Sequence, residues 1–123
     1  MTTALTEILQ AYADAWGDIE PSKRQELLDK SWSEDGVYRD PTGEAAGKTA
    51  WMAHIAGFHA SMPGHEMRLT SGASEHHGHI YFSWRLTNPQ GEVVTDGVDF
   101  GTLDADGRIA QIVGFFGPPP AAT

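Results

Sequence analysis

The chain has 123 residues, a formal net charge of −9 and no cysteine, and its length suits one domain with one hydrophobic core. The lack of cysteine excludes disulfides, a thiolate nucleophile and a cysteine metal site, and the acidic balance argues against nucleic acids and anionic membranes as partners, because both select basic patches. No run reaches the roughly 20 apolar residues of a membrane span, and the start lacks the basic and apolar regions of a signal peptide, so we expect a cytoplasmic location.

The N-terminal half carries three segments with apolar residues at helical spacing. The first lies near the start of the chain, and the second opens at Pro21 and ends near Trp32. A short strand over 36–41 ends at a proline, and the third helix covers 47–62 before a Pro-Gly pair breaks it. The inward faces of these helices consist of Leu5, Ile8, Leu9, Tyr12 and Trp16, then Leu27 and Leu28, then Trp51, Ile55, Phe58 and Met62.

The C-terminal half carries four strand-like runs, at 65–73, 79–87, 92–103 and 108–116, separated by turn residues. Helices followed by strands, without alternation, predict an α+β domain in which helices cover an antiparallel sheet. We expect this single domain to comprise residues 1–117, followed by a proline-rich, extended tail at 118–123.

Asp99 is the most informative residue, because it lies in the middle of a strand that should be buried. Side chains alternate across a strand, so Asp96 and Asp99 point to opposite faces and only one of them can face the core. A buried carboxylate must be paired or must take up a proton, and a carboxyl kept neutral in an apolar pocket becomes a hydrogen-bond donor. Two alternatives stay open: Asp99 pairs with a nearby arginine, or the strand register places it in water.

The order of the elements resembles the NTF2-like fold, a cone in which a curved antiparallel sheet wraps around N-terminal helices and encloses a pocket. Three positions resemble the catalytic set of Δ5-3-ketosteroid isomerase, within the SnoaL-like group of that superfamily. Tyr12 matches the family's helix tyrosine, an oxyanion-hole donor; Asp40, followed by Pro41, matches its general base; Asp99 matches its protonated carboxylic acid. The resemblance covers nearly the whole chain except the proline tail. Relatives that are not steroid isomerases also keep an Asp-Pro and a strand aspartate.

The resemblance implies a cofactor-independent pocket enzyme that moves a proton next to a carbonyl in a small hydrophobic ligand. Asp40 would remove the proton, and Tyr12 and Asp99 would hold the developing enolate oxygen, as in the known ketosteroid isomerases. An aldol-type cyclase would use the same groups, since it also begins with an enolate. We expect the three residues to meet in one cavity between sheet and helices, with His54 near its mouth. The expected walls are Trp16, Trp32, Phe58, Leu103 and Phe116.

Three alternatives to this function stay open. A dehydratase would use His54 with Tyr38 or Tyr12, as relatives of the scytalone dehydratase kind use histidines with tyrosines. If Arg85 faced the pocket, it would ionise Asp99, and the pocket would suit an acidic or polar ligand. A non-catalytic binding or assembly module is the third alternative, because a fold does not guarantee an activity.

Three further motifs do not predict sites. The histidines at 76–79 lack a partner at fixed distance, the segment 43–49 is one residue shorter than a phosphate loop, and the turn at 104–107 lacks the remaining ligands of a calcium loop. We therefore expect no metal and no cofactor.

The strand that carries Asp99 is apolar on its other face as well. Val94, Val98 and Phe100 fall on the face opposite Asp99, and one helix layer can cover only one side of the sheet. We therefore expect a homodimer that forms through the sheet.

Overall fold

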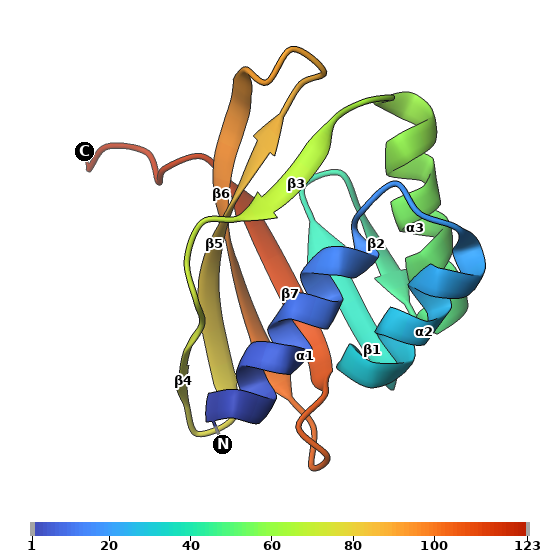
Figure 1. The fold of residues 1–123 in the computed structure, drawn as a ribbon. Helices are drawn as coiled ribbons and strands as arrows, with labels where there is room; N and C mark the ends of the chain where they lie inside the picture. The colour runs from blue at the N-terminus through green and yellow to red at the C-terminus, as the bar shows by residue number, and fades with distance from the viewer. Residues whose placement is uncertain (1, 123) are drawn as a thin grey trace.

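The computed structural model describes residues 2–122 as helices packed on one side of a curved sheet (Figure 1). Within these residues, no helix is long and apolar enough to cross a membrane. The elements in chain order are α1 (Thr2–Ala15), α2 (Pro21–Ser31), β1 (Trp32–Asp40), β2 (Gly43–Ala46), α3 (Lys48–Ser61), β3 (Glu66–Leu69), β4 (Ser74–His76), β5 (His79–Thr87), β6 (Val93–Leu103) and β7 (Ile109–Phe116).

The strand order is β2-β1-β7-β6-β5-β3, and β4 pairs with β5. The predicted α+β, NTF2-like architecture is confirmed, with one difference: β1 pairs with β7 in parallel, so the sheet is mixed. The two strands come from distant parts of the chain, so no hairpin fixes their relative direction. Two local differences also appear, because β2 follows Pro41 and Thr42 where no strand was predicted, and the run 65–73 divides into β3 and a bent connection toward β4.

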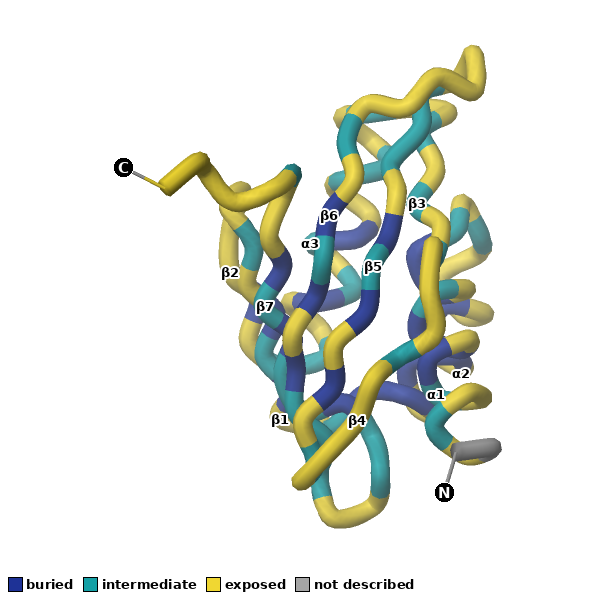
Figure 2. Tube along the Cα trace, turned by 90° about the vertical axis from the view of Figure 1, so that its left-hand side faces the viewer, coloured by how far each residue is buried: buried dark blue, intermediate teal, exposed yellow. Residues whose placement is uncertain are grey.

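The helix-covered side of the sheet holds the core. On β5, the residues Ile80, Phe82 and Trp84 are buried, whereas Tyr81 and Arg85 point to the other face and are exposed. The same alternation runs along β6 and β7 (Figure 2). An aromatic cluster fills the space between this face and the helices. Three of its stacked pairs are Tyr12–Trp32, Trp32–Trp51 and Tyr38–Trp51, with ring centroids 5.9, 5.2 and 4.0 Å apart.

The face of Val98 and Phe100 is opposite that of Asp99, as the alternation predicted. The prediction for Val94 is wrong, because this residue lines a cavity on the helix-covered side. The register between β5 and β6 shifts between Leu86 and Thr87, which pair with Thr95 and Val93, and this bulge re-aims Val94.

Candidate active site

Two carboxyl side chains lie on either side of a glycine in the middle of the sheet. Gly114 of β7 pairs with Asp99 of β6, and on its other side β7 runs beside β1, which ends at Asp40. A Cβ atom on Gly114 would lie 2.8 Å from Asp99 Oδ1, 3.5 Å from Asp40 Cβ and 3.7 Å from the Tyr38 hydroxyl. The missing side chain of Gly114 therefore lets these three groups approach one another across β7.

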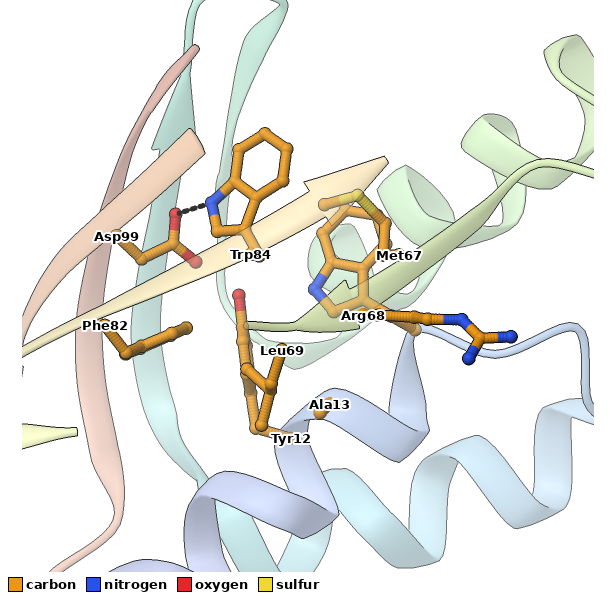
Figure 3. A pocket seen from close by; sticks show the side chains of 9 residues that line it. Tyr12, Ala13, Met67, Arg68, Leu69, Phe82, Trp84 and Asp99 are labelled. Carbon is orange, nitrogen blue, oxygen red and sulfur yellow. Dashed lines mark hydrogen bonds between the residues drawn. The ribbon is translucent and has the colours of Figure 1, made fainter. Parts of the chain in front are cut away.

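Asp99 is a buried carboxyl with one hydrogen-bond donor. Its exposed fraction is 5%, and Trp84 Nε1 donates to Oδ1 at 3.0 Å (Figure 3). Burial raises the pKa of Asp99 to about 7; the Trp84 hydrogen bond opposes this shift, and the nearby charge of Asp40 adds to it. At neutral pH the protonated form, a hydrogen-bond donor, is therefore well populated.

The alternative in which Arg85 pairs with Asp99 is wrong. Arg85 lies on the opposite face of β5, where its Nε donates to Asp96 Oδ1 at 2.7 Å in an exposed ion pair. The alternation along β5 that buries Trp84 turns Arg85 outward.

Tyr12 presents an unpaired hydroxyl to Asp99. Figure 3 shows the hydroxyl directed toward the Asp99 carboxyl, and it makes no hydrogen bond within the part of the chain that the structure describes. Burial, followed by the negative charge of Asp99, raises the pKa of Tyr12 well above its ordinary value; the nearby Trp16 indole, which does not meet hydrogen-bond geometry, opposes only part of this rise, so the phenol keeps its proton. Beside the two groups lies a cavity of about 20 Å³, room for about one water-sized atom.

Asp40 has a different environment, because donors surround its carboxyl group. Oδ1 accepts hydrogen bonds from the Thr42 backbone N–H at 2.7 Å and the Thr42 hydroxyl at 2.6 Å. Oδ2 accepts one from the Tyr38 hydroxyl at 2.6 Å, and His54 Nε2 lies 3.9 Å from it. Burial raises the pKa of Tyr38, and the neighbouring Tyr12 and its bond to Asp40 add to the rise, so Tyr38 remains a donor.

Asp40 opens onto a larger cavity of about 580 Å³ between the sheet and α3. Four of the predicted ligand-binding residues line it, namely Trp16, His54, Phe58 and Phe116. The other two lie elsewhere: Trp32 is fully buried and stacks behind Tyr12, and Leu103 packs against the core near the far end of β6. Leu103 was placed by strand alternation, which gives a face but not a depth in the core, and Trp32 by the spacing of the family resemblance.

The three predicted catalytic residues are close but do not share one cavity. Tyr12 and Asp99 line the small cavity, whereas Asp40 lines the large one. The side chains that line both are Trp16, Met67 and Trp84. No group of three or more His, Asp or Glu side chains in the described part of the chain is arranged to hold a metal ion.

Sequence reasoning missed the residues that position the carboxyls. Trp84 lies flat over β6 because Gly97, its partner in the register, has no side chain: a Cβ there would lie 2.1 Å from the indole. Glycines inside strands are the signal that could have found this close approach at Gly97 and at Gly114. The partner of each glycine depends on the strand register, which the sequence alone does not specify.

The comparisons with known proteins agree with this architecture. The family model described as the SnoaL-like domain matches residues 9–112. The chain belongs to the SnoaL-like family. No curated protein matches its sequence.

Solved structures resemble this member of the SnoaL-like family over nearly its whole length. A protein from Agrobacterium tumefaciens, described as a proposed isomerase of the SnoaL-like family, is 32% identical with a TM-score of 0.86, covering 94% of this chain and 99% of its own. A proposed SnoaL-like polyketide cyclase from Jannaschia is 17% identical with a TM-score of 0.72, covering 94% and 86%. An NTF2-like protein of unknown function from Exiguobacterium is 19% identical with a TM-score of 0.73, covering 91% and 99%. The last two likenesses concern the fold alone.

Proposed function

We propose that the protein transfers a proton alpha to a carbonyl in a small hydrophobic ligand, as an isomerase or as the enolate-forming step of a cyclase. The observation that carries this proposal is the small cavity beside Tyr12 and Asp99. An unpaired phenol and a carboxyl with a pKa of about 7 flank a space for one oxygen atom. Two buried neutral donors at one oxygen site are what a developing enolate needs. The isomerase description of the Agrobacterium protein, which is 32% identical, points in the same direction.

The proposed reaction assigns one role to each group. Asp40 accepts the proton from the carbon next to the carbonyl; the electron pair of that C–H bond forms a C=C bond to the carbonyl carbon, and the π pair of the C=O bond moves to the oxygen as the enolate forms. Tyr12 and Asp99 donate hydrogen bonds to that oxygen. In an isomerase Asp40 returns the proton to a different carbon; in a cyclase the enolate carbon forms a C–C bond to a second carbonyl of the same ligand, whose oxygen takes up the proton.

The large cavity supports a hydrophobic ligand. Its volume of about 580 Å³ lies within the usual range for small-molecule sites, and aromatic and aliphatic side chains form most of its walls. Asp40, Tyr38, Thr42 and His54 form one polar corner of it. A flat, polycyclic ketone would place its rings between Trp16, Phe58 and Phe116.

A specific observation also favours a second candidate, a dehydratase. The Tyr38–Asp40 hydrogen bond of 2.6 Å and the His54–Asp40 separation of 3.9 Å bring a phenol and an imidazole to one carboxylate. There, His54 would remove the proton from the carbon next to the carbonyl and pass it to the leaving hydroxyl, which departs as water while Tyr38 holds it by a hydrogen bond. In this case His54→Ala would abolish turnover of a β-hydroxyketone, whereas Tyr12→Phe would leave most of it.

The experiment that tests the first function is exchange of alpha protons for deuterium in a β,γ-unsaturated cyclic ketone, followed by NMR. Asp40→Asn should slow exchange by about 10²–10⁴-fold, because the amide keeps the shape but cannot accept the proton. Asp35→Asn, an exposed carboxylate on the same strand, is the matched control. Wild-type protein that binds the ketone without exchanging its protons would exclude the catalytic role and favour a binding module.

We propose in addition that the protein is a homodimer. Tyr81, Phe100 and Phe115 are 52%, 42% and 56% exposed on the side of the sheet that none of the helices within residues 2–122 covers. A second copy of the same aromatic face would cover them.

A further inference from the structure

The proposed donors and the proposed base lie on opposite sides of a wall. The donor cavity beside Tyr12 and Asp99 has a volume of about 20 Å³, and the cavity beside Asp40 has one of about 580 Å³. Three side chains line both cavities, Trp16, Met67 and Trp84. A ligand that fills the large cavity reaches the donors with its carbonyl oxygen only if one of these three moves.

We propose that Met67 is the residue that opens this wall and thereby selects ligands by the bulk around their carbonyl group. The inference rests on the proposed function, because it assumes that the carbonyl oxygen binds between Tyr12 and Asp99. It assigns ligand selectivity to a side chain that neither donates nor accepts a proton.

Trp84 is fixed in place by its surroundings. Its indole N–H donates to Asp99 at 3.0 Å, and its ring lies over the Cα of Gly97 and meets the edge of Phe116, with centroids 5.6 Å apart. Moving Trp84 would break the hydrogen bond to the carboxyl that the ligand needs as a donor.

Trp16 is fixed through its backbone and its ring. Arg24 donates to the carbonyl oxygens of Ala15 and Gly17 at 2.9 and 2.8 Å, and His59 Nε2 lies 2.7 Å from the carbonyl oxygen of Trp16 itself. The indole makes edge contacts with three further aromatic rings at centroid distances of 5.3 to 6.0 Å, those of Tyr38, Trp51 and Phe58.

Met67 is the least constrained of the three. It lies on β3, a strand of four residues at the edge of the sheet, and its register partner is Leu86 of β5. Its side chain is unbranched and rotates about three bonds. Met67 also lines a third cavity of about 310 Å³ near His59 and His65, which offers space for the displaced thioether.

The position of Met67 predicts a dependence on bulk next to the carbonyl. A ligand with hydrogen beside the oxygen-bearing carbon needs a small displacement of Met67, whereas a methyl group at that position needs a larger one. Shortening Met67 should remove this discrimination. Replacing it by isoleucine, which has a similar volume but a stiff, branched Cβ, should strengthen it.

Binding of two naphthols tests the inference without reference to turnover. The probes are 2-naphthol and 1-methyl-2-naphthol, whose single oxygen can bind between Tyr12 and Asp99, and fluorescence titration gives their dissociation constants. We expect wild-type protein to prefer 2-naphthol by about tenfold or more, on the scale of one methyl group in a closed pocket. Met67→Ala should reduce this preference to about twofold or less, and Met67→Ile should raise it. Met62→Ala, which enlarges only the large cavity, is the matched control and should keep the wild-type ratio.

Two further variants separate failure of this inference from failure of the proposed function. Tyr12→Phe and Asp99→Leu each remove one donor with little change of shape, so each should weaken 2-naphthol binding if its oxygen lies between the two groups. If they do so and Met67→Ala keeps the wild-type ratio, the role of Met67 is overturned and the donor site stands. If neither variant weakens binding, the oxygen lies elsewhere, and both the donor site and the role of Met67 are overturned. Thermal melting of each variant confirms that it is folded.

Discussion

Asp40 and Asp99 show how one sheet gives two carboxyl groups different properties. Asp40 accepts three hydrogen bonds from Tyr38 and Thr42, whereas Asp99 accepts one from Trp84 and lies among apolar side chains. Pairs of acids with such unlike surroundings are typical of sites that need a base and an acid at one pH. The difference arises from their places in the fold, because Asp40 is the last residue of β1, beside a turn, whereas Asp99 lies in the middle of β6.

Asp99 should make stability depend on pH in a defined direction. Its folded pKa of about 7 exceeds the ordinary aspartate value, so between about pH 4 and 7 the folded state binds more protons and the free energy of unfolding falls as pH rises. Asn at position 99 does not titrate, so Asp99→Asn removes this pH dependence. The free energy of unfolding of the variant, relative to that of wild type, should therefore be higher at pH 8 than at pH 5 by an amount on the order of a few kcal/mol. Urea denaturation at the two pH values measures the change. A difference that is the same at both values would contradict the burial of a protonated Asp99.

Gly114 should tolerate no side chain. In Gly114→Ala the new Cβ would lie 2.8 Å from Asp99 Oδ1, so the carboxyl or the strand must shift, and we expect weaker naphthol binding together with a loss of about 1–3 kcal/mol in stability. Gly57→Ala is the contrasting variant, because a Cβ there meets nothing within 4 Å and lies in α3. It should stabilise the protein by about 0.5–1 kcal/mol. Chemical denaturation of both variants decides whether close approach at Gly114 matters.

At the scale of elements, the end of α1 depends on one buried side chain. Arg24 is 4% exposed and donates to the carbonyl oxygens of Ala15 and Gly17. Because α1 ends here, no next helical turn offers backbone N–H groups to these oxygens. Arg24→Met should cost about 2–3 kcal/mol, since two charge-assisted hydrogen bonds are lost, and should weaken ligand binding by loosening Trp16. Arg24→Lys should recover only part of both effects, because one ammonium group replaces a fork of donors. Lys23→Met, its exposed neighbour, serves as the control in thermal melting; an equal loss there would contradict the capping role.

Elements with a local pattern were predictable and those that depend on distant pairing were not. The helices and the β5–β6–β7 hairpins follow from periodicity and turn residues, so their bounds agree with the predictions to within a few residues. The parallel β1–β7 pair and the bulge at Val94 depend on register between strands, which leaves no local signal. The same limit applies to the site: the face of Asp99 was predictable, but its partner Trp84 and the wall at Met67 were not.

At the scale of the whole molecule, one face of the sheet has no cover within the described residues. Tyr81 pairs with Phe100, Phe100 with Val113, and Val98 with Phe115, so these five residues form a continuous apolar patch across β5, β6 and β7. The two-fold self-association proposed above would bury this patch, and the aromatic side chains would supply most of the buried area.

A charge in the middle of this patch should prevent the dimer. Phe100→Glu places a carboxylate on the apolar surface of both copies, and each carboxylate would have to lose its hydration in the interface. Sedimentation at micromolar concentration should therefore show a dimer for wild type and a monomer for the variant. Gln25→Glu adds the same charge on exposed α2, away from the sheet, and should leave the dimer intact. Asp99 lies on the other face of β6, so the Phe100→Glu monomer should still bind 2-naphthol. A wild-type monomer, or a Phe100→Glu dimer, would place the interface elsewhere or remove it.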